Sequence, residues 1–201
     1  MSETPQLVQR ATERARAAGF PLTRAEAGCA GPSASLPGVG RFLAVLAAGC
    51  HGGSIAECGT GTGIGAAWIA SAMPSDCTLV TAELDPGRAA VAAALLAGDP
   101  RVQVIQGDAD IVLAPRAPFD LIFNDGGQRD DASFAARVGM LKAGGRIVSD
   151  DLTPVAALPP GSPFLDDDPK RRLWSAEPRL LWTEVVLPDL ANSLLVGTRI
   201  E

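Results

Sequence analysis

The sequence predicts one α/β domain built on a mainly parallel β-sheet with helices on both faces. Short apolar runs alternate with helical patterns through the middle of the chain, a glycine-rich loop joins the first such run to the first such helix, and two further apolar runs close the chain. Strands that alternate with helices at this spacing are typical of parallel sheets. The 201 residues suffice for a single domain, spanning 1–201, and are too few for two large ones.

The first half of the alternating region contains three predicted strands and two predicted helices. Strands are expected at 54–58, 77–82 and 102–106, where apolar and β-branched residues cluster. Helices are expected at 64–73, which is rich in alanine, and at 86–96, which has a proline in its first turn.

The second half adds two more strands, a helix and a terminal hairpin. A strand is expected at 119–124, followed by a helix at 131–141 that stops at a glycine pair, and then by a strand at 146–149. The last two apolar runs, 181–187 and 193–199, are joined by a short segment with turn-forming residues. This arrangement is typical of an antiparallel hairpin.

Two segments outside this alternation have their own expected roles. Residues 1–50 carry helical patterns at 5–18 and 37–48 without a strand between them, so we expect helices that cover the sheet. The segment 152–175 is rich in proline between 154 and 169, which predicts an irregular loop. Long loops of this kind often form lids or substrate walls.

Composition and charge narrow the function. The chain has 17 basic and 23 acidic residues and a net charge of −6, which opposes nucleic acid as a partner because phosphate binding needs a basic face. Its apolar runs are too short to span a bilayer, which indicates no membrane partner, and its first residues lack the apolar core of a signal peptide. We therefore expect a cytoplasmic protein that acts on a small molecule.

The cysteines do not form a recognisable metal site or disulfide framework. Cys29, Cys50, Cys58 and Cys77 include no C-x-x-C pair, and no histidine lies at zinc-finger spacing. A domain of this size does not need disulfides for stability, so we expect free and mostly buried thiols.

The loop after the first predicted strand, ECGTGTGIG at 57–65, has four glycines at every second position. Glycines let the backbone turn tightly and let a ligand lie against the main chain. The helix that begins after the loop would direct its free N–H groups toward that ligand. A plain strand–helix turn needs neither the alternation nor the preceding acid, so the loop indicates a cofactor site.

Two cofactor classes fit this loop. The dinucleotide fingerprint G-x-G-x-x-G/A is met by Gly61, Gly63 and Ala66, with Glu83 about 20 residues later to hold a ribose. The second class is S-adenosylmethionine. A dinucleotide domain would normally continue with parallel strands, so the terminal hairpin favours S-adenosylmethionine over NAD.

The spacing of Glu57 and the alternating glycines resembles that of the class I S-adenosylmethionine-dependent methyltransferases, and more closely that of their small O-methyltransferase branch, the catechol and caffeoyl-CoA type. The resemblance runs from about residue 38 to the C-terminus. It implies a Rossmann-like, mostly parallel seven-stranded sheet with an antiparallel C-terminal hairpin, and methyl transfer to a small hydroxylated substrate. In the loop it implies cofactor contacts from Gly59, Thr60, Gly61 and Gly63. It gives Glu57 two open roles, either contact with the amino-acid end of the cofactor or ordering of the loop.

The resemblance also assigns roles beyond the loop. Glu83, at the end of the second predicted strand, would accept hydrogen bonds from both ribose hydroxyls. Asp108 and Ala109 follow the third strand and match the turn that contacts adenine, although Asp108 is equally suited to capping a helix. Asp125 would hold the amino group of the cofactor. Relatives include both monomers and dimers, so a homodimer stays open.

Three acids follow two neighbouring predicted strands. Asp125 comes directly after 119–124, and Asp150 and Asp151 come directly after 146–149. Ligands bind at the carboxyl edge of a parallel sheet, and three carboxylates there would raise one another's pKa unless a cation relieved them. Mg²⁺ or another divalent cation on these acids would relieve the repulsion. Capping of the following turn, or contact of Asp125 with the amino group of the cofactor, is the alternative that needs no metal. The related metal-dependent enzymes use an Asp-Asn pair after the fifth strand, where this chain has two acids.

The chain departs from the family at the position of a lysine near the reacting hydroxyl. Gln128 stands there, with Arg129 beside it, and neither side chain can act as a general base. Catalysis is therefore expected to rest on Asp125 and Asp151, with the cation or solvent as the other routes for deprotonation. Trp174 has two open roles, as a wall for an aromatic substrate or as a packing residue.

Two alternative functions remain at this stage. The missing lysine favours a protein that binds S-adenosylmethionine or S-adenosylhomocysteine without turnover, whereas the acid cluster favours an enzyme. An NAD-dependent oxidoreductase is the weaker rival.

Overall fold

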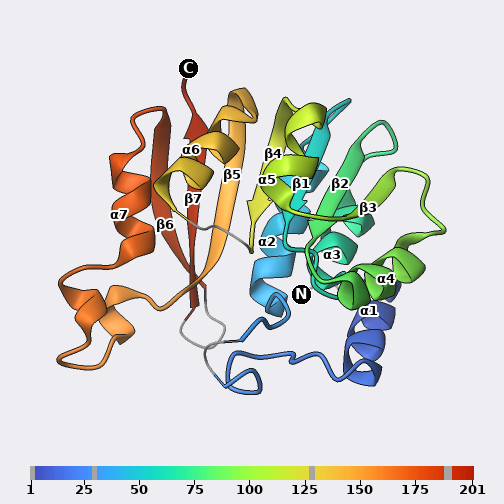
Figure 1. Ribbon diagram of the computed structural model, residues 1–201, viewed down its shortest axis with the longest axis horizontal. Coiled ribbons are helices and arrows are strands. Elements are labelled where there is room, and N and C mark those ends of the chain that lie inside the picture. Colours follow the sequence, from blue (N-terminus) through green and yellow to red (C-terminus); the bar gives the residue numbers. More distant parts are fainter. Residues whose placement is uncertain (1–2, 29–30, 127–129, 188–191) are drawn as a thin grey trace.

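A seven-stranded β-sheet runs through the centre of the molecule in the order β3-β2-β1-β4-β5-β7-β6 (Figure 1). The computed structural model describes residues 3–28, 31–126, 130–187 and 192–201. The strands are β1 (Ser54–Cys58), β2 (Thr78–Glu83), β3 (Val102–Gln106), β4 (Phe119–Asn124), β5 (Leu141–Leu152), β6 (Leu180–Leu187) and β7 (Asn192–Arg199). The predicted strands at 54–58, 102–106 and 119–124 are confirmed to the residue.

The direction of the strands confirms the predicted mixed sheet. Strands β1 to β5 pair in parallel, whereas β7 lies antiparallel between β5 and β6. Only β7 is therefore reversed, and β6 runs in the same direction as the first five strands. The predicted turn between the last two strands, at 188–191, lies outside the described residues.

Helices cover both faces of this sheet (Figure 1). Leu43, Ile69 and Leu96 belong to the apolar core on one face, and Phe134 and Trp174 to the core on the other. The first face carries the helices α1 (Gln6–Ala17), α2 (Pro37–Ala48), α3 (Ile64–Ala72) and α4 (Pro86–Leu96), and the second carries α5 (Ala109–Val112), α6 (Asp131–Gly139) and α7 (Pro169–Ala176). No helix in the described ranges combines the length and apolarity needed to cross a bilayer.

The prediction that a helix stops at the glycine pair 144–145 is wrong. Helix α6 ends at Gly139, and both glycines lie inside β5, which begins at Leu141. The pairing of β5 with β4 shifts register between Phe119 and Leu121. An irregular strand accommodates glycine where a regular helix would not, so here the glycines mark a bent strand rather than a helix stop.

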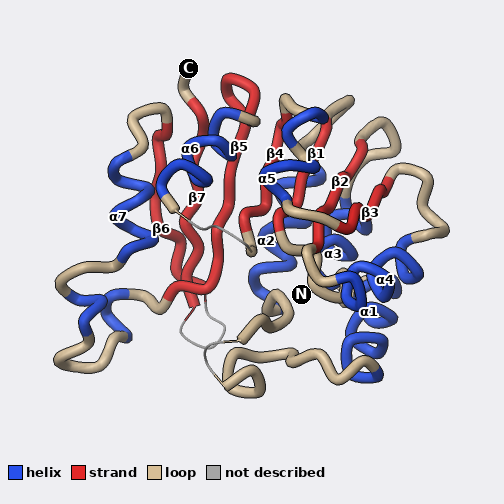
Figure 2. The backbone as a smooth tube through the Cα atoms, viewed as in Figure 1, coloured by secondary structure: helices blue, strands red, loops and turns tan. Residues whose placement is uncertain are grey.

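The segment 152–175 is less irregular than expected. Short helical turns at Val155–Ala157 and Pro163–Leu165 separate β5 from α7 (Figure 2), and α7 itself begins at Pro169. Asp168 caps this helix by accepting hydrogen bonds from the main-chain N–H groups of residues 170 and 171, at 2.9 and 3.0 Å. Proline is tolerated in the first helical turn, so the last proline of the segment starts a helix instead of preventing one.

Trp174 on α7 is a packing residue. Its side chain is fully buried, and its ring lies 5.3 Å from that of Phe134 and 6.0 Å from that of Trp182. Gly197 of β7 leaves the space that the indole fills, because a Cβ there would lie 2.9 Å from the ring. Of its two possible roles, the substrate wall is therefore wrong and core packing is confirmed.

Candidate active site

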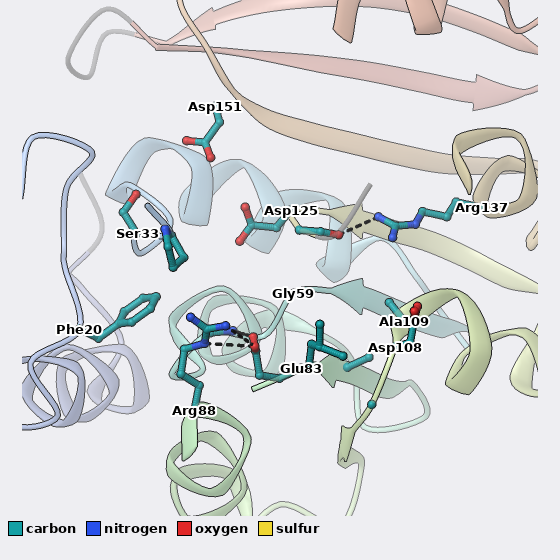
Figure 3. A pocket seen from close by; sticks show the side chains of 16 residues that line it. Phe20, Ser33, Gly59, Glu83, Arg88, Asp108, Ala109, Asp125, Arg137 and Asp151 are labelled. Atoms are coloured by element: carbon teal, nitrogen blue, oxygen red, sulfur yellow. Dashed lines mark hydrogen bonds and ion pairs between the residues drawn. The ribbon is translucent and has the colours of Figure 1, made fainter. Parts of the chain in front are cut away.

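A cavity of about 330 Å³ lies at the carboxyl edge of the sheet. It is bounded by the glycine loop after β1, by the ends of β2, β3, β4 and β5, and by a stretch of the N-terminal segment. In Figure 3, Phe20 and Ser33 face Asp125, with Glu83 and Arg88 at one side and Asp108 and Ala109 at the other. The remaining lining residues include Pro32, Gly59, Gly61, Ala82, Leu84, Gly107, Gly126, Arg137 and Asp151.

Gly59 lets two loops meet at the floor of this cavity. Its φ is +92°, and a Cβ on it would lie 2.9 Å from the Cα of Gly126. The N–H groups of Asp125 and Gly126 both donate to the carbonyl of Cys58, at 3.1 and 2.7 Å. Any larger residue at position 59 would push these loops apart, so the glycine fixes where Asp125 stands relative to the first strand.

Glu57 lies behind the glycine loop and does not line the cavity. Thr81 donates to its Oε2 at 2.5 Å, while Oε1 is buried without a hydrogen-bond partner in the described part of the chain. A Cβ on Gly65 would lie 2.3 Å from that oxygen. Burial raises the pKa of Glu57 to about 8. This geometry supports the role of ordering the loop rather than contact with a ligand in the cavity.

Glu83 stands at the end of β2 with its carboxylate held from several sides. The main-chain N–H of Gly61 donates to Oε2 at 2.8 Å, and that of Asp85 donates to Oε1 at 3.0 Å. Arg88 donates to Oε1 from Nε and Nη2. Asp85 also caps α4 by accepting from the N–H of Arg88, as expected for an acid at the start of a helix. The glycine loop and the predicted ribose acid are thus joined directly.

The turn after β3 places Asp108 and Ala109 on the cavity wall opposite Phe20 (Figure 3). Asp108 caps the short helix α5 by accepting from the N–H of Asp110 at 3.0 Å. Asp108 therefore both caps α5 and lines the cavity.

Two predicted cofactor contacts lie away from the larger cavity. Thr60 makes a hydroxyl–hydroxyl hydrogen bond with Thr81, and it lines a small hollow that shares Phe20, Ser33, Gly61 and Asp125 with the larger cavity. Gly63 faces α4, where a Cβ would lie 3.2 Å from Leu95 and 3.4 Å from Ala92. Both residues shape the loop.

Asp125, Asp150 and Asp151 converge as predicted. One carboxylate oxygen from each lies within 4.8 Å of the other two. Burial, followed by the charge of Asp150, raises the pKa of Asp125 well above its ordinary value, and burial together with the charge of Asp151 raises the pKa of Asp150 to about 6. The hydrogen bond between these two side chains raises the pKa of Asp125 further and lowers that of Asp150.

An irregularity in β5 brings two consecutive acids to the same place. Neighbouring residues of a regular strand point to opposite faces of a sheet. Here the pairing of β5 with β7 shifts between Ser149 and Leu152, and Asp151 has a φ of +62°. It is the only non-glycine residue with positive φ among those described. Aspartate and asparagine tolerate this conformation better than other non-glycine residues.

The three carboxylates fit a divalent cation. Oxygens that flank a hard cation with bonds of about 2.1–2.5 Å lie up to about 4–5 Å apart, which matches the cluster. In addition, Oδ1 of Asp150 is buried without a hydrogen-bond partner in the described ranges. A cation would supply that partner and neutralise the crowded charge.

Several residues that line the larger cavity could not be predicted from the sequence. Phe20 and Ser33 come from an irregular stretch of the N-terminal segment, and Arg88 and Arg137 come from helices whose patterns indicate only burial. Arg137 is almost fully buried, and it joins Asp110, Asn124 and the carbonyl of Gly126. Pairing of this kind depends on the tertiary structure.

Other predicted positions have plain outcomes. Gln128 and Arg129, where relatives carry the lysine, lie outside the described residues. His51, the only histidine in the sequence, lines a separate hollow together with Asp120 and Lys142. Cys50, Cys58 and Cys77 are free and buried, and Cys29 lies outside the described residues.

Comparisons with known proteins agree with this architecture. A family model described as a methyltransferase domain matches residues 56–152. A putative O-methyltransferase of Mycobacterium tuberculosis is 35% identical over 125 residues, which cover 59% of this chain and 56% of the relative. One from Mycobacterium marinum is 34% identical over the same length and coverage. The chain thus spans little more than half the length of the curated relatives it matches.

Solved structures share the fold over almost the whole chain. The O-methyltransferase of Bacillus cereus in complex with SAH has a TM-score of 0.76 at 22% identity, covering 99% of this chain and 93% of that one. A putative O-methyltransferase from Klebsiella pneumoniae has a TM-score of 0.75 at 25% identity, covering 99% and 92%.

Residues 56–152 therefore resemble a methyltransferase domain, and almost the whole chain has the fold of the two solved O-methyltransferase structures. Both of these relatives and both structures are named as O-methyltransferases.

Proposed function

We propose that this chain transfers the methyl group of S-adenosylmethionine to an oxygen atom of a small hydroxylated acceptor. The observation that carries the proposal is the position of Glu83 and the cluster around Asp125 on opposite sides of one cavity, with the glycine loop between them. A carboxylate for the ribose and a group of acids for the reacting hydroxyl then border the same cavity.

The cavity residues suit the parts of the cofactor in sequence. Glu83 would accept hydrogen bonds from the ribose hydroxyls, because a carboxylate can accept two at once. Gly59 and Gly61 would let the cofactor lie against the main chain, and Asp108 and Ala109 would contact the adenine. Asp125 would accept from the amino group of the methionine part.

Methyl transfer needs little covalent chemistry from the protein. The acceptor oxygen forms a bond to the methyl carbon while the bond from that carbon to the sulfonium sulfur breaks, and the electron pair stays on the sulfur of S-adenosylhomocysteine. The hydroxyl proton would pass to the carboxylate of Asp151, whose side chain is 46% exposed and borders the cavity. Catalysis then consists mainly of positioning and of lowering the acceptor's pKa.

A divalent cation such as Mg²⁺ would be held by Asp125, Asp150 and Asp151. When bound, it would favour the ionised form of the acceptor hydroxyl. The buried and unpartnered Oδ1 of Asp150 supports this assignment.

The acceptor would lie under the segment 152–175, which serves as a lid. A second cavity of about 230 Å³ lies between that segment and the N-terminal segment, and Asp151 borders both cavities. A ligand in the second cavity would therefore meet the cofactor at Asp151.

Two measurements test the proposal. Calorimetry should show binding of S-adenosylmethionine and S-adenosylhomocysteine and no binding of NAD, since the reversed strand β7 and the family both oppose a dinucleotide enzyme. Incubation with S-adenosylmethionine and a panel of catechols should release S-adenosylhomocysteine. Cofactor binding without release across hydroxylated acceptors of several sizes would instead support the alternative of a binding protein.

A further inference from the structure

Two cations flank the acidic pair at the end of β5, and both line the second cavity. Lys170, in the first turn of α7, donates from Nζ to the main-chain carbonyl of Asp150 at 2.6 Å. Arg24, in the N-terminal segment, donates from Nη1 to the main-chain carbonyl of Asp151 at 3.4 Å. Both cations border the cavity of about 230 Å³ that shares Asp151 with the larger cavity.

These hydrogen bonds hold the two side chains in place and leave other N–H donors of each side chain available. A lysine ammonium has three N–H groups and a guanidinium has five. Within the described part of the chain, each of the two side chains makes one hydrogen bond, and Arg24 also lies 4.0 Å from Asp151 Oδ1. The side chain of Arg24 is 45% exposed, so a ligand can reach it. Donors therefore remain for an anionic group in the cavity.

Of the two described acids that line the second cavity, only Asp151 pairs with one of these cations, at 4.0 Å from Arg24. Asp168 also lines it, but its carboxylate caps α7 and pairs with Arg171 at 2.6 Å. Asp151 is left as the acid that faces a ligand, beside the cofactor cavity. One side of the cavity is thus cationic, and the edge shared with the cofactor cavity is acidic.

The remaining wall is apolar. Leu158 and Phe164 line the cavity from the lid segment, and Phe164 is 50% exposed, so a ligand can reach its ring. A volume of about 230 Å³ is below the usual range of about 300–1,000 Å³ for ligand sites, so the ligand is small, on the order of one ring.

We propose that the methyl acceptor is a small hydroxy acid. Its carboxylate is bound by Arg24 and Lys170, its apolar body packs against Leu158 and Phe164, and its hydroxyl lies at Asp151. This inference rests on the proposed methyl transfer and adds the substrate class. The two cations therefore determine specificity, selecting acids over neutral alcohols or phenols of the same shape.

The test compares a matched pair of acceptors, 3,4-dihydroxybenzoate and its methyl ester, by the release of S-adenosylhomocysteine. We expect the wild type to prefer the acid at least tenfold in kcat/KM, mainly through KM. The Lys170→Met and Arg24→Met variants should each reduce the acid-over-ester ratio about tenfold. Arg172→Met is the control, because Arg172 is an exposed cation on the same helix that pairs with Asp167 and lines neither cavity. It should keep the preference.

A second measurement separates this inference from the proposed function. Benzoate has no hydroxyl to methylate, so its binding to the protein loaded with S-adenosylhomocysteine, followed by NMR, reports on the anion site alone. Binding that is lost in Lys170→Met and retained in Arg172→Met supports the site even if no acceptor is methylated. An equal rate for acid and ester in the wild type, or benzoate binding that is unchanged in Lys170→Met and in Arg24→Met, would overturn the inference. Unchanged unfolding midpoints show that the variants fold.

Discussion

Arg88 donates to the same carboxylate oxygen of Glu83 from both Nε and Nη2, at 3.1 and 2.9 Å. The N–H of Gly61 holds the other oxygen at 2.8 Å. The carboxylate at the end of β2 is thus fixed by an arginine from α4 and by the glycine loop itself. A ribose that binds Glu83 meets a charged acceptor already in place, which reduces the entropy lost on binding.

The first prediction concerns this acceptor. Glu83→Ala should weaken binding of S-adenosylhomocysteine by about 1.5–3 kcal/mol, the scale of hydrogen bonds to a charged group. Arg88→Ala should have a smaller effect, because the N–H groups of Gly61 and Asp85 still hold the carboxylate. Calorimetry on both variants tests whether Glu83→Ala weakens binding more than Arg88→Ala does. Unchanged affinity in Glu83→Ala would remove this residue from the site.

The sequence predicts most of the fold because local pattern and global topology agree in the sheet. The apolar runs of β1 and β4 are short and mostly buried, and that of the edge strand β3 is short and partly exposed. All three are bounded by turn residues, so their limits can be predicted from the sequence. Helix α7 could not be predicted, because the proline at its start is equally compatible with a loop. Only the capping hydrogen bonds of Asp168, which the structure shows, favour the helix. The bulge at Asp151 depends on pairing with β7, which is distant in the sequence.

The site was predictable where it follows the ends of strands. Glu83 and Asp125 stand at or directly after the end of a strand, and Asp150 lies two residues before the end of β5. Parallel topology alone brings such positions to one edge. Arg24 and Lys170 lie far from that edge in the sequence and reach it through the N-terminal segment and α7. No periodicity marks residues that meet only in the folded chain.

The second prediction concerns the pH dependence of stability. The pKa of Glu57 is about 8 in the folded chain, against an ordinary value of 4.5. Between these values the folded protein keeps a proton that the unfolded chain releases, so the free energy of unfolding should fall as pH rises from about 4.5 to 8. Glu57→Gln has the same shape and cannot ionise, so its stability should fall less over that interval. Urea unfolding at pH 5, 6.5 and 8 measures both, and parallel curves would contradict the assignment.

The third prediction concerns the backbone at Asp151. Asp151→Asn and Asp151→Ala both remove the charge, yet only asparagine tolerates a φ of +62° well. We expect Asp151→Ala to be less stable than Asp151→Asn by roughly 1 kcal/mol. Urea unfolding in the presence of a chelator isolates the backbone effect from that of any cation. Equal stability of the two variants would show that the conformation costs little.

The fourth prediction separates packing from substrate contact at Trp174. Trp174→Ala should destabilise the protein by about 3–5 kcal/mol, since it empties space between Phe134 and Trp182. Trp174→Phe keeps part of the volume and removes a buried indole N–H that has no hydrogen-bond partner in the described chain, so it should cost less. In Trp174→Phe the KM for a catechol should change less than twofold. A large rise in KM without a loss of stability would instead indicate that Trp174 contacts the substrate.

The last prediction concerns the acid cluster. Three carboxylates with oxygens within 4.8 Å of one another repel when ionised, and a divalent cation would relieve that repulsion and satisfy the buried oxygen of Asp150. In a thermal-shift titration with S-adenosylhomocysteine present, Mg²⁺ should raise the unfolding midpoint of the wild type by several degrees. Asp150→Ala should abolish this shift, whereas Asp76→Asn, which removes an exposed acid before β2, should preserve it. An asparagine at 150 offers one neutral oxygen, so Asp150→Asn should shift the Mg²⁺ dependence to higher concentrations. If the wild type shows no stabilisation by cations, and a chelator leaves methyl transfer intact, the carboxylates act without a metal, and the proton route through Asp151 has to account for the activity.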